Sequence, residues 1–288
     1  MEIIMKKLRV AALQTQVFED KKNTLIHLEE MLCRAMEMAE ADPSIDGLDL
    51  VTVGEMFTCP YVTSNFPLYA EEEGGPSYSF CSNLASRFGI YLSAGSMPER
   101  DPEGHVYNTA YVFDPEGKQI ARHRKMHLFD INVEGGQQFR ESDTLTAGNE
   151  IVTFDTKFCR MGLCVCYDMR FPELARIMAL DGARVILVPA AFNLTTGPAH
   201  WEIMFRGRAI ENEVFVIGTS PARNPDGPYV AWGHSMAVSP WGKVLYELDE
   251  KEGIALAALD LDEVTRMRQE LPFFNQRRTD LYELRRKK

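Results

Sequence analysis

Apolar and polar positions follow two different periods along the first part of the chain. A run of apolar residues over 10–17 predicts a strand. Behind it, apolar residues recur at steps of three and four, which predicts an amphipathic helix with Leu25, Leu28, Leu32, Ala35 and Ala39 on one face. Short β-rich runs at 48–53 and 89–96 lie on either side of a helical stretch around 81–87. Strands that alternate with helices indicate βαβ units around a largely buried sheet.

Two turn signals predict β-hairpins. The sequence Asp-Pro-Glu-Gly separates strand-like segments at 107–113 and 119–124, so the second strand delivers Lys125 at its far end. The sequence Pro-Trp-Gly separates a second pair of strands, at 235–239 and 243–248.

The order of strands and helices repeats in the second half. Strands are predicted at 151–154, 161–166, 185–191, 214–220 and 254–259, and helices at 173–180, 201–212 and 262–270. No Gly/Ser linker, charge run or short repeat divides the chain. We therefore expect one α/β domain over 1–288. Its C-terminal extension, 271–288, is apolar enough to pack on the body or on a partner subunit.

The charge balance argues against several kinds of partner. The chain has 31 basic and 42 acidic residues, a net charge of −11. Such a surface repels phosphate backbones and anionic membranes, so we expect neither nucleic acid nor membrane as a partner. No window reaches the roughly 18 apolar residues of a membrane span.

The start of the chain and the cysteines predict a cytoplasmic protein. Lys6, Lys7 and Arg9 are not followed by the apolar segment of an export signal. Six cysteines in a chain without such a signal indicate reduced thiols. Only Cys164 and Cys166 lie close together, so the cysteine spacing gives little support to a metal site.

Cys166 is the cysteine with the strongest case for chemistry. It ends the predicted strand 161–166 and is followed by Asp168 and Arg170 before a helix begins. Reactive groups in α/β sheets lie at the carboxyl ends of strands. Most free cysteines are small buried hydrophobes. We apply that interpretation to Cys33, Cys81, Cys159 and Cys164. Cys59 lies close to Glu55 in an irregular stretch and could line a site, but a structural role is preferred for it as well.

A cysteine nucleophile needs a base or a nearby cation, since a thiol with an ordinary pKa is only about 3% thiolate at neutral pH. The sequence offers two kinds of partner: a histidine, or a carboxylate base together with a fixed positive charge. The histidines are His127, His200 and His234, and the second pair is Glu55 and Lys125. Spacing alone does not decide between them.

Glu55 and Lys125 each also have an ordinary structural explanation. Glu55 follows the predicted strand 48–53 and suits the first solvated position of a loop. Lys125 suits a surface cluster with Arg122 and Arg124.

Three separated segments resemble the motifs of the nitrilase superfamily of carbon–nitrogen hydrolases. They are Gly-Glu-Met-Phe at 54–57, Arg-Lys-Met-His-Leu-Phe at 124–129 and Cys-Tyr-Asp-Met-Arg-Phe-Pro-Glu at 166–173. The resemblance covers nearly the whole chain, and three motifs in the right order are a specific signal. Within the superfamily, the segments 191–201 and 229–235 look like the ω-amidase branch.

The resemblance implies a fold and an assembly. The superfamily's fold is a four-layer αββα sandwich, and two such subunits usually pack face to face. We therefore expect a homodimer or a higher homo-oligomer.

The resemblance also implies a catalytic set. Glu55 would be the general base, Lys125 the stabiliser of the oxyanion and transition state, and Cys166 the nucleophile, so the histidines are not the base. A second glutamate, which orients the substrate or assists the base, maps onto Glu141. Without the resemblance, a first-turn or loop carboxylate would be the preferred interpretation of Glu141. The backbone N–H of Tyr167 would be a second oxyanion donor, and the resemblance implies no metal and no organic cofactor.

The branch implies a small-molecule amide as substrate, namely the ω-amide of an α-keto acid such as α-ketoglutaramate or α-ketosuccinamate. The reaction would release ammonia and pass through an acyl-thioester. Substrate choice would rest on Arg170, Phe192 and Thr196, because an arginine can grip the remote carboxylate with two hydrogen bonds. As an alternative, Arg170 bridges Asp168 or Glu173.

Two other functions remain open at this point. The chain could be a different amidase of the superfamily, acting on N-carbamoyl compounds, deaminated glutathione or nitriles. It could also be a binding module without catalysis, although the presence of Glu55, Lys125, Cys166 and Glu141 argues against that.

Overall fold

The computed structural model describes residues 7–135 and 137–287. The predicted absence of an export signal concerns in part residues 1–6, which lie outside the described residues. Gly136 and Lys288 lie outside them as well.

Six strands form the first sheet, in the order β14-β1-β2-β3-β4-β5. The pairs β1/β2 and β2/β3 are parallel, and the outer pairs are antiparallel. The bounds are β1 (Lys7–Gln14), β2 (Leu50–Val53), β3 (Tyr91–Arg100), β4 (Val106–Phe113), β5 (Gln119–Arg124) and β14 (Gly253–Asp260).

The second sheet also has six strands, in the order β13-β12-β11-β10-β9-β8, with parallel pairs β9/β10 and β10/β11. The bounds are β8 (Val152–Asp155), β9 (Arg160–Leu163), β10 (Val185–Pro189), β11 (Phe215–Thr219), β12 (Met236–Val238) and β13 (Val244–Glu247). A separate ribbon pairs β6 (Asp130–Asn132) with β7 (Gln138–Arg140).

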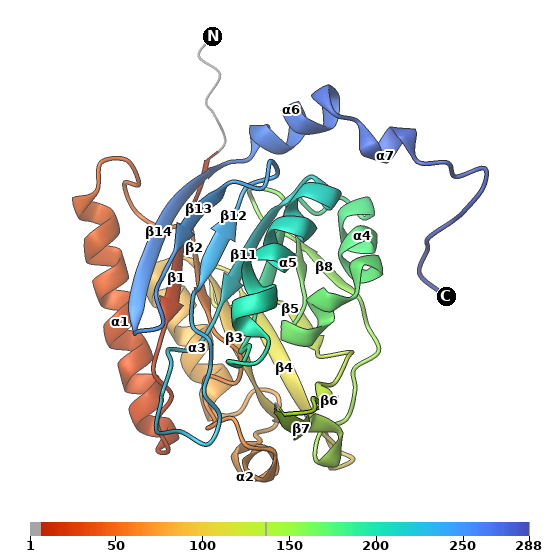
Figure 1. Ribbon diagram of the computed structural model, residues 1–288. Helices are drawn as coiled ribbons and strands as arrows, with labels where there is room; N and C mark the ends of the chain where they lie inside the picture. The colour runs from red at the N-terminus through yellow and green to blue at the C-terminus, as the bar shows by residue number, and fades with distance from the viewer. Residues whose placement is uncertain (1–6, 136, 288) are drawn as a thin grey trace.

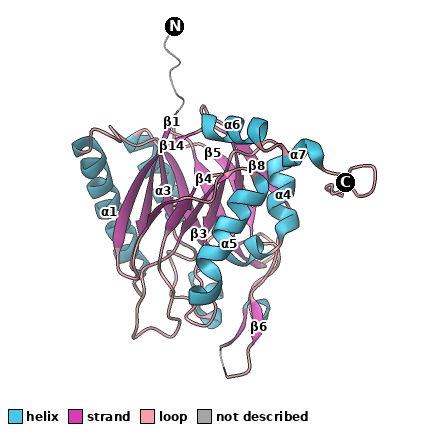
Figure 2. Ribbon diagram, turned by 45° about the horizontal axis from the view of Figure 1, so that its top comes forward, coloured by secondary structure: helices cyan, strands magenta, loops and turns pink. Residues whose placement is uncertain are grey.

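Helices cover the outer face of each sheet (Figure 1). α1 (Lys21–Ala41) and α3 (Pro76–Phe88) pack on the first sheet, and α4 (Pro172–Leu180) and α5 (Gly197–Asn212) on the second. The strands lie between these two helical layers in Figure 2 as well. This arrangement confirms the predicted four-layer αββα sandwich.

Local signals set where these helices begin. The Asp20 side chain accepts a hydrogen bond from the backbone N–H of Lys22 and caps α1. α3, α4 and α5 each have a proline in the first turn, where no backbone donor is needed.

Apolar side chains fill the space between the two sheets. Leu8 and Val10 of the first sheet join one buried cluster with Leu163, Leu187 and Val216 of the second. A second cluster lies between the first sheet and the helices α1 and α3. A hydrogen bond of 2.7 Å also joins the hydroxyls of Thr52 and Thr219 across the two sheets. The sheets are therefore held in contact near the ends of β2 and β11.

Several predicted boundaries were wrong, and three of them lie close to the segments that carry the site. The strand predicted to reach Cys166 ends at Leu163, because the Asp168 carboxylate takes up the backbone N–H of Val165 in a local turn. The first strand ends at Gln14 rather than at 17. Gln14 pairs with Gly253, which is the first residue of the partner strand β14. α5 begins at Gly197, four residues before the predicted start, with Pro198 in its first turn.

Short helices complete the description. They are η1 (Thr63–Asn65), α2 (Phe66–Tyr69), η2 (Glu141–Asp143), η3 (Cys166–Arg170), α6 (Asp262–Glu270) and α7 (Phe273–Gln276). None of the helices in the described part of the chain has both the length and the apolar character needed to cross a bilayer.

The C-terminal extension contacts the body through part of its length. The ring of Phe274 in α7 packs against the central apolar cluster, and the guanidinium groups of Arg176 and Arg268 lie over it at 4.9 and 5.0 Å. Farther along, Leu281 and Tyr282 are 70% and 57% exposed. The arm beyond α7 loops outward in Figure 1 and then turns back, so that Arg286 pairs with Asp181 just after α4.

Candidate active site

Three chain segments from both sheets meet at one buried site. Glu55 lies two residues after β2, Lys125 directly follows β5, and Cys166 opens η3 beyond β9. The side chains of Glu55 and Lys125 are fully buried, and Cys166 is 5% exposed. Lys125 is therefore not part of a surface cluster, and Glu55 is not a solvated loop residue.

The Lys125 ammonium is held by two carboxylates. Its Nζ donates to Oε1 of Glu55 and to Oε1 of Glu141, both at 2.9 Å. Burial by itself would lower the pKa of Lys125, but the two carboxylates outweigh it and raise that pKa above its usual range. The amine therefore stays charged, and one of its three hydrogens is left for another acceptor.

Cys166 has an unusual backbone and a proton that can be transferred. Its φ of +46° lies in the left-handed region, which non-glycine residues seldom adopt. Burial and the neighbouring Glu55 carboxylate raise the pKa of the Cys166 thiol, while Lys125 opposes this. The resting side chain is thus a thiol beside a carboxylate that can accept its proton.

Glu55 is fixed by further donors. Asn108 Nδ2 at 2.8 Å and the Tyr61 hydroxyl at 3.0 Å donate to Oε1, and the backbone N–H of Ala191 donates to Oε2 at 2.8 Å. Sequence reasoning missed Tyr61 and Asn108. Tyr61 lies only six residues after Glu55, but Asn108 lies inside a predicted strand and carries no motif.

Glu141 belongs to the same cluster. It begins η2 and is fully buried; its Oε1 lies 2.6 Å from the Tyr61 hydroxyl oxygen, and its Oε2 accepts from the backbone N–H of Phe129 at 2.7 Å. Burial raises the pKa of Glu141, although Lys125 works against it. Glu141 therefore lies in the first turn of a short helix, as its structural explanation predicted, but it is buried and bonded to Lys125.

Asp168 anchors the segments that carry Lys125 and Cys166. Its carboxylate accepts from His123 Nε2 and His127 Nδ1, both at 2.8 Å, and from the backbone N–H groups of His127 and Val165. Although burial opposes ionisation, these hydrogen bonds hold the pKa of Asp168 well below its usual range. A single buried anion thus joins the chain after β5 to the chain before η3.

The three candidate histidines are bonded elsewhere. His127 contacts Asp168, His200 Nδ1 lies 3.0 Å from a guanidinium nitrogen of Arg170, and His234 pairs with Glu247 at 3.3 Å. The structure instead brings Glu55 and Lys125 to Cys166.

Arg170 lies between aromatic rings at the end of η3. Its guanidinium is 4.6 Å from the ring centre of Phe192 and 5.5 Å from that of Tyr167. Its polar contacts in the described chain are His200 and the sulfur of Met204, and its Nε is buried without a hydrogen-bond partner. The alternative in which Arg170 bridges Asp168 or Glu173 is wrong.

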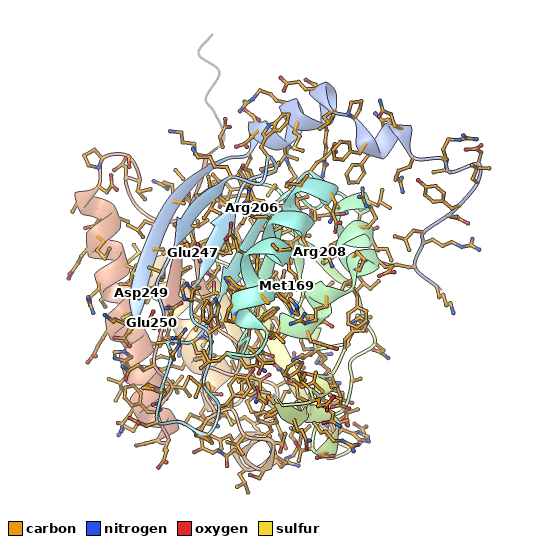
Figure 3. All side chains as sticks on the ribbon, in the orientation of Figure 1. Met169, Arg206, Arg208, Glu247, Asp249 and Glu250 are labelled. Carbon is orange, nitrogen blue, oxygen red and sulfur yellow. The ribbon has the colours of Figure 1, made fainter. Side chains whose placement is uncertain are left out.

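Two further predicted site residues, Thr196 and Tyr167, lie at the starts of different helices, α5 and η3. The Thr196 hydroxyl bonds the side chain of Asn193 at 3.2 Å within the turn before α5. Tyr167 follows Cys166 in the first turn of η3, where backbone N–H groups have no acceptor within the helix. Arg208 of α5 supports η3 by donating to the carbonyl oxygens of Met169 and Arg170 at 2.7 and 3.0 Å (Figure 3).

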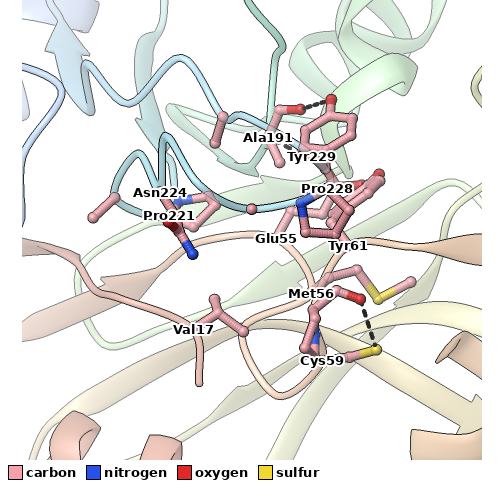
Figure 4. Close-up of a pocket in the computed structure, with 14 residues that line it drawn as sticks. Val17, Glu55, Met56, Cys59, Tyr61, Ala191, Pro221, Asn224, Pro228 and Tyr229 are labelled. Carbon is pink, nitrogen blue, oxygen red and sulfur yellow. Dashed lines mark hydrogen bonds between the residues drawn. The ribbon is translucent and has the colours of Figure 1, made fainter. Parts of the chain in front are cut away.

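A cavity opens beside Glu55 (Figure 4). Tyr61, Ala191 and Tyr229 line it together with Glu55, and the segment 221–231 forms much of its wall. Cys166 and Lys125 are not among its lining residues, so this cavity reaches the site from the side of the carboxylate. Cys59 also lines it. Burial raises the pKa of Cys59 to about 12, which suits a structural thiol.

One group of side chains in the described chain has ligand atoms close enough for a metal. Asp101, Glu103 and His105 bring them within 4.8 Å of one another, but Glu103 and His105 are exposed. Exposed acidic groups gather in this way without an ion. We assign no metal role to them.

Comparisons with known proteins identify the family of the chain. The family model described as carbon-nitrogen hydrolase matches residues 9–269. Omega-amidase NIT2 of Bos taurus is 46% identical over 284 residues, which is 99% of this chain and 100% of the relative. Omega-amidase NIT2 of Homo sapiens is 44% identical with the same coverage.

A solved structure shares the fold. Nit3 of Saccharomyces cerevisiae, described as a member of branch 10 of the nitrilase superfamily, has a TM-score of 0.86 and 40% identity and covers 94% of this chain and 97% of its own. The comparisons confirm the resemblance to the nitrilase superfamily and to its ω-amidase branch. The chain belongs to the carbon–nitrogen hydrolase family and is a hydrolase of the nitrilase superfamily.

Proposed function

We propose that this enzyme is an ω-amidase, which hydrolyses the ω-amide of an α-keto acid such as α-ketoglutaramate or α-ketosuccinamate to the dicarboxylate and ammonia. The observation that carries the chemistry is a buried thiol next to the Glu55 carboxylate, beside an ammonium that Glu55 and Glu141 hold in place. Relatives of 44–46% identity over nearly the whole chain are named omega-amidase, which supports the substrate class.

The first half of the reaction forms a thioester. Glu55 takes the thiol proton as the sulfur of Cys166 attacks the amide carbon. The third hydrogen of Lys125 and the backbone N–H of Tyr167 meet the developing oxyanion, and each such donor contributes about 10²–10³ in rate. Glu55 then gives its proton to the departing nitrogen. Ammonia leaves, and an acyl-thioester on Cys166 remains.

The second half regenerates the thiol. Glu55 removes a proton from water, which attacks the thioester carbon through a second oxyanion. The carbon–sulfur bond breaks, the dicarboxylate leaves, and Glu55 returns the proton to the sulfur. We propose no metal or organic cofactor for either half, because base, nucleophile and oxyanion donors are all side-chain or backbone groups of this chain.

Arg170 supports a substrate with a remote carboxylate. It contacts no carboxylate in the described part of the chain, and desolvation lowers its pKa below the usual range, so its positive charge lacks a counter-ion. A substrate carboxylate would supply one through two parallel hydrogen bonds. Phe192 forms a face beneath the guanidinium, and the Thr196 hydroxyl donates to the side chain of Asn193 in the neighbouring turn.

The first prediction concerns the nucleophile. Cys166→Ala should abolish ammonia release from α-ketoglutaramate while leaving the circular dichroism spectrum unchanged, because only a sulfur atom is lost from the site. Cys33→Ala, which changes a partly buried cysteine on α1, should keep full activity.

The outcomes separate chemistry from substrate. Ammonia release by the Cys166→Ala enzyme would contradict the thioester route. If the wild-type enzyme hydrolysed only nitriles, N-carbamoyl compounds or deaminated glutathione, the substrate would be wrong and the nucleophile would stand. If it hydrolysed nothing in such a panel, the binding-module alternative would be favoured.

A further inference from the structure

The Tyr61 hydroxyl lies between the two buried carboxylates of the site. Its oxygen is 3.0 Å from Oε1 of Glu55 and 2.6 Å from Oε1 of Glu141. The Tyr61 ring is held in place by the ring of Tyr229, stacked at 4.5 Å, and by the edge-on ring of Phe66 at 5.4 Å. The hydroxyl therefore bridges the two carboxyl groups in a fixed position.

A count of hydrogens shows that one is missing from this bridge. A tyrosine hydroxyl has one hydrogen, so Tyr61 can donate to Glu55 or to Glu141 but not to both. The other contact joins two oxygens at hydrogen-bond distance. It is a hydrogen bond only if a carboxyl group carries the second hydrogen. Lys125 donates to the same two carboxylate oxygens but supplies no hydrogen to the Tyr61 oxygen.

The donors around each carboxylate indicate where that hydrogen resides. Glu55 also accepts from Asn108 Nδ2 and from the backbone N–H of Ala191, both at 2.8 Å, which stabilises its ionised form. Glu141 has one such additional donor, the backbone N–H of Phe129. Glu141 is therefore the better holder of the proton, and Tyr61 donates toward Glu55.

We propose that Tyr61 links Glu55 and Glu141 into a pair that shares one proton, with Glu55 as the ionised member that serves as base. The inference rests on the proposed function. A proton can cross the link when the carboxyl hydrogen of Glu141 moves to the Tyr61 oxygen as the hydroxyl hydrogen moves to Glu55. Two O–H bonds break and two form, so the charge only changes place.

The other charged and titratable groups around the bridge agree with a single negative charge. Lys125 lies at the end of β5 and contacts both carboxylates, the Cys166 thiol faces Glu55 from η3, and the Tyr229 hydroxyl donates to the carbonyl of Ala191. Arg170 lies within electrostatic range of Tyr229. One carboxylate balances Lys125, whereas two would leave an uncompensated charge in a buried site.

The test is the pH profile of Tyr61→Phe, which removes the hydroxyl and keeps the ring. Glu55 loses a donor to its ionised form, so the acid limb of the kcat/KM profile should move to higher pH. Protonated Glu141 loses its acceptor, so the alkaline limb should move to lower pH. We expect each limb to shift by about one pH unit, the size of one hydrogen bond to an ionised group.

A second readout does not need the proposed substrate. Iodoacetamide alkylates Cys166, and the rate of this reaction should begin to rise at a higher pH in Tyr61→Phe than in the wild type. The reason is that Glu55 remains protonated up to a higher pH in the variant. The kinetic profile itself is measured on whichever amide the wild-type enzyme hydrolyses. Failure of α-ketoglutaramate to react would therefore count against the proposed substrate, not against the shared proton.

Two further variants make the result specific. Glu141→Gln keeps an oxygen that accepts from Lys125 and holds no carboxyl proton that can be lost, so its alkaline limb should disappear while the acid limb stays. Tyr111→Phe removes another buried hydroxyl, beside the Glu99 carboxylate on the first sheet, and should leave both limbs unmoved.

A purely structural role for Tyr61 would lower kcat/KM at every pH and leave both limbs in place, and that result would overturn the proposal. A persistent alkaline limb in Glu141→Gln would also overturn it. If Tyr61→Phe failed to fold, the Glu141→Gln profile would decide alone.

Discussion

Lys125 is a fully buried ammonium, and its two carboxylate partners account for its position. Removing a charge from water costs several kcal/mol unless a partner of opposite charge and good geometry repays it. Glu55 and Glu141, each 2.9 Å from Nζ, offset that cost. Their hydrogen bonds also fix the direction of the remaining N–H of Lys125. Loss of either side chain therefore removes a hydrogen bond that positions Lys125 and also changes the shape of the site.

Arg170 provides a residue-level test of substrate choice. Arg170→Gln should lower kcat/KM for α-ketoglutaramate by about 10²-fold, mainly through KM, because a two-point hydrogen bond to a carboxylate is lost. Turnover of a short amide without a carboxylate should change little. Ammonia release measured on both substrates checks the prediction.

A matched control lies on the neighbouring helix. Arg206 of α5 pairs with Glu202 near the surface, so Arg206→Gln should leave both substrates unaffected. An equal loss on both substrates in the Arg170 variant would mean that Arg170 supports η3 and does not select the substrate.

The sequence was enough to predict the site residues that lie in recognisable motifs. It was not enough to predict the residues that only the fold brings close to them. Glu55, Lys125, Cys166 and Glu141 were all named from the resemblance, and the structure brings them together. Asn108 comes from a strand interior and meets Glu55 only because β4 lies two strands from β2 in the sheet. No local pattern marks such a contact.

Elements meet at Asp168, which ties the chain after β5 to the chain before η3. Five hydrogen bonds converge on its carboxylate, two from imidazole rings and three from backbone N–H groups. Since the first segment carries Lys125 and the second carries Cys166, the spacing between ammonium and thiol depends on this anion.

Asp168→Asn should therefore impair both stability and catalysis. An amide has one oxygen to accept these donors, so we expect a loss of about 2–4 kcal/mol in the free energy of unfolding at neutral pH. Activity should fall as well, since the two segments lose their common anchor. Urea unfolding and ammonia release measure the two effects, and Asp155→Asn, an exposed partner of Arg160, should change neither.

The same variant has a defined pH dependence. The folded-state pKa of Asp168 lies below the value of about 3.9 in the unfolded chain. Its stabilisation is therefore complete above that value and is lost as the pH falls toward the folded-state pKa. The stability gap between wild type and Asp168→Asn should be constant above about pH 5 and should shrink in stronger acid. A gap that grew on acidification would contradict this account.

Predicted elements were correct where periodicity and turn residues agreed. The hairpins β4/β5 and β12/β13 and the helices α1 and α6 appear where the sequence predicts them. The strand predicted to reach Cys166 was too long, because an apolar run cannot reveal that the amide of Val165 bonds to the Asp168 side chain. The pairing β6/β7 was missed, since its three-residue strands carry no alternation.

At the scale of the whole molecule, α5 leaves an apolar surface uncovered. Ile203 and Ile210 are seven residues apart and share one face of the helix, with 73% and 38% of their surface exposed. Trp241, in the turn beside Ile210, is 51% exposed. We call these three residues the α5 patch. The resemblance implies face-to-face pairing of subunits, and we propose that a second copy covers this patch.

Ile203→Glu should then weaken the dimer by about 100-fold or more, because association would bury an unpaired charge. Light scattering during gel filtration measures the mass at several concentrations. Ile26→Glu changes an exposed apolar residue of α1 in the opposite outer layer and should keep the dimer. A wild-type mass of one chain at every concentration would remove the proposal.

The two sheets repeat the same series of strand directions, read from β14 in one and from β8 in the other. In this correspondence β2 matches β10, so Glu55 and Ala191, which are hydrogen-bonded, follow equivalent strands. Glu55 and Lys125 follow strands of the first sheet, whereas Cys166 follows a strand of the second. Hydrolysis therefore depends on the relative position of the two sheets. A small slide of one sheet against the other would abolish activity while every strand and helix stayed intact.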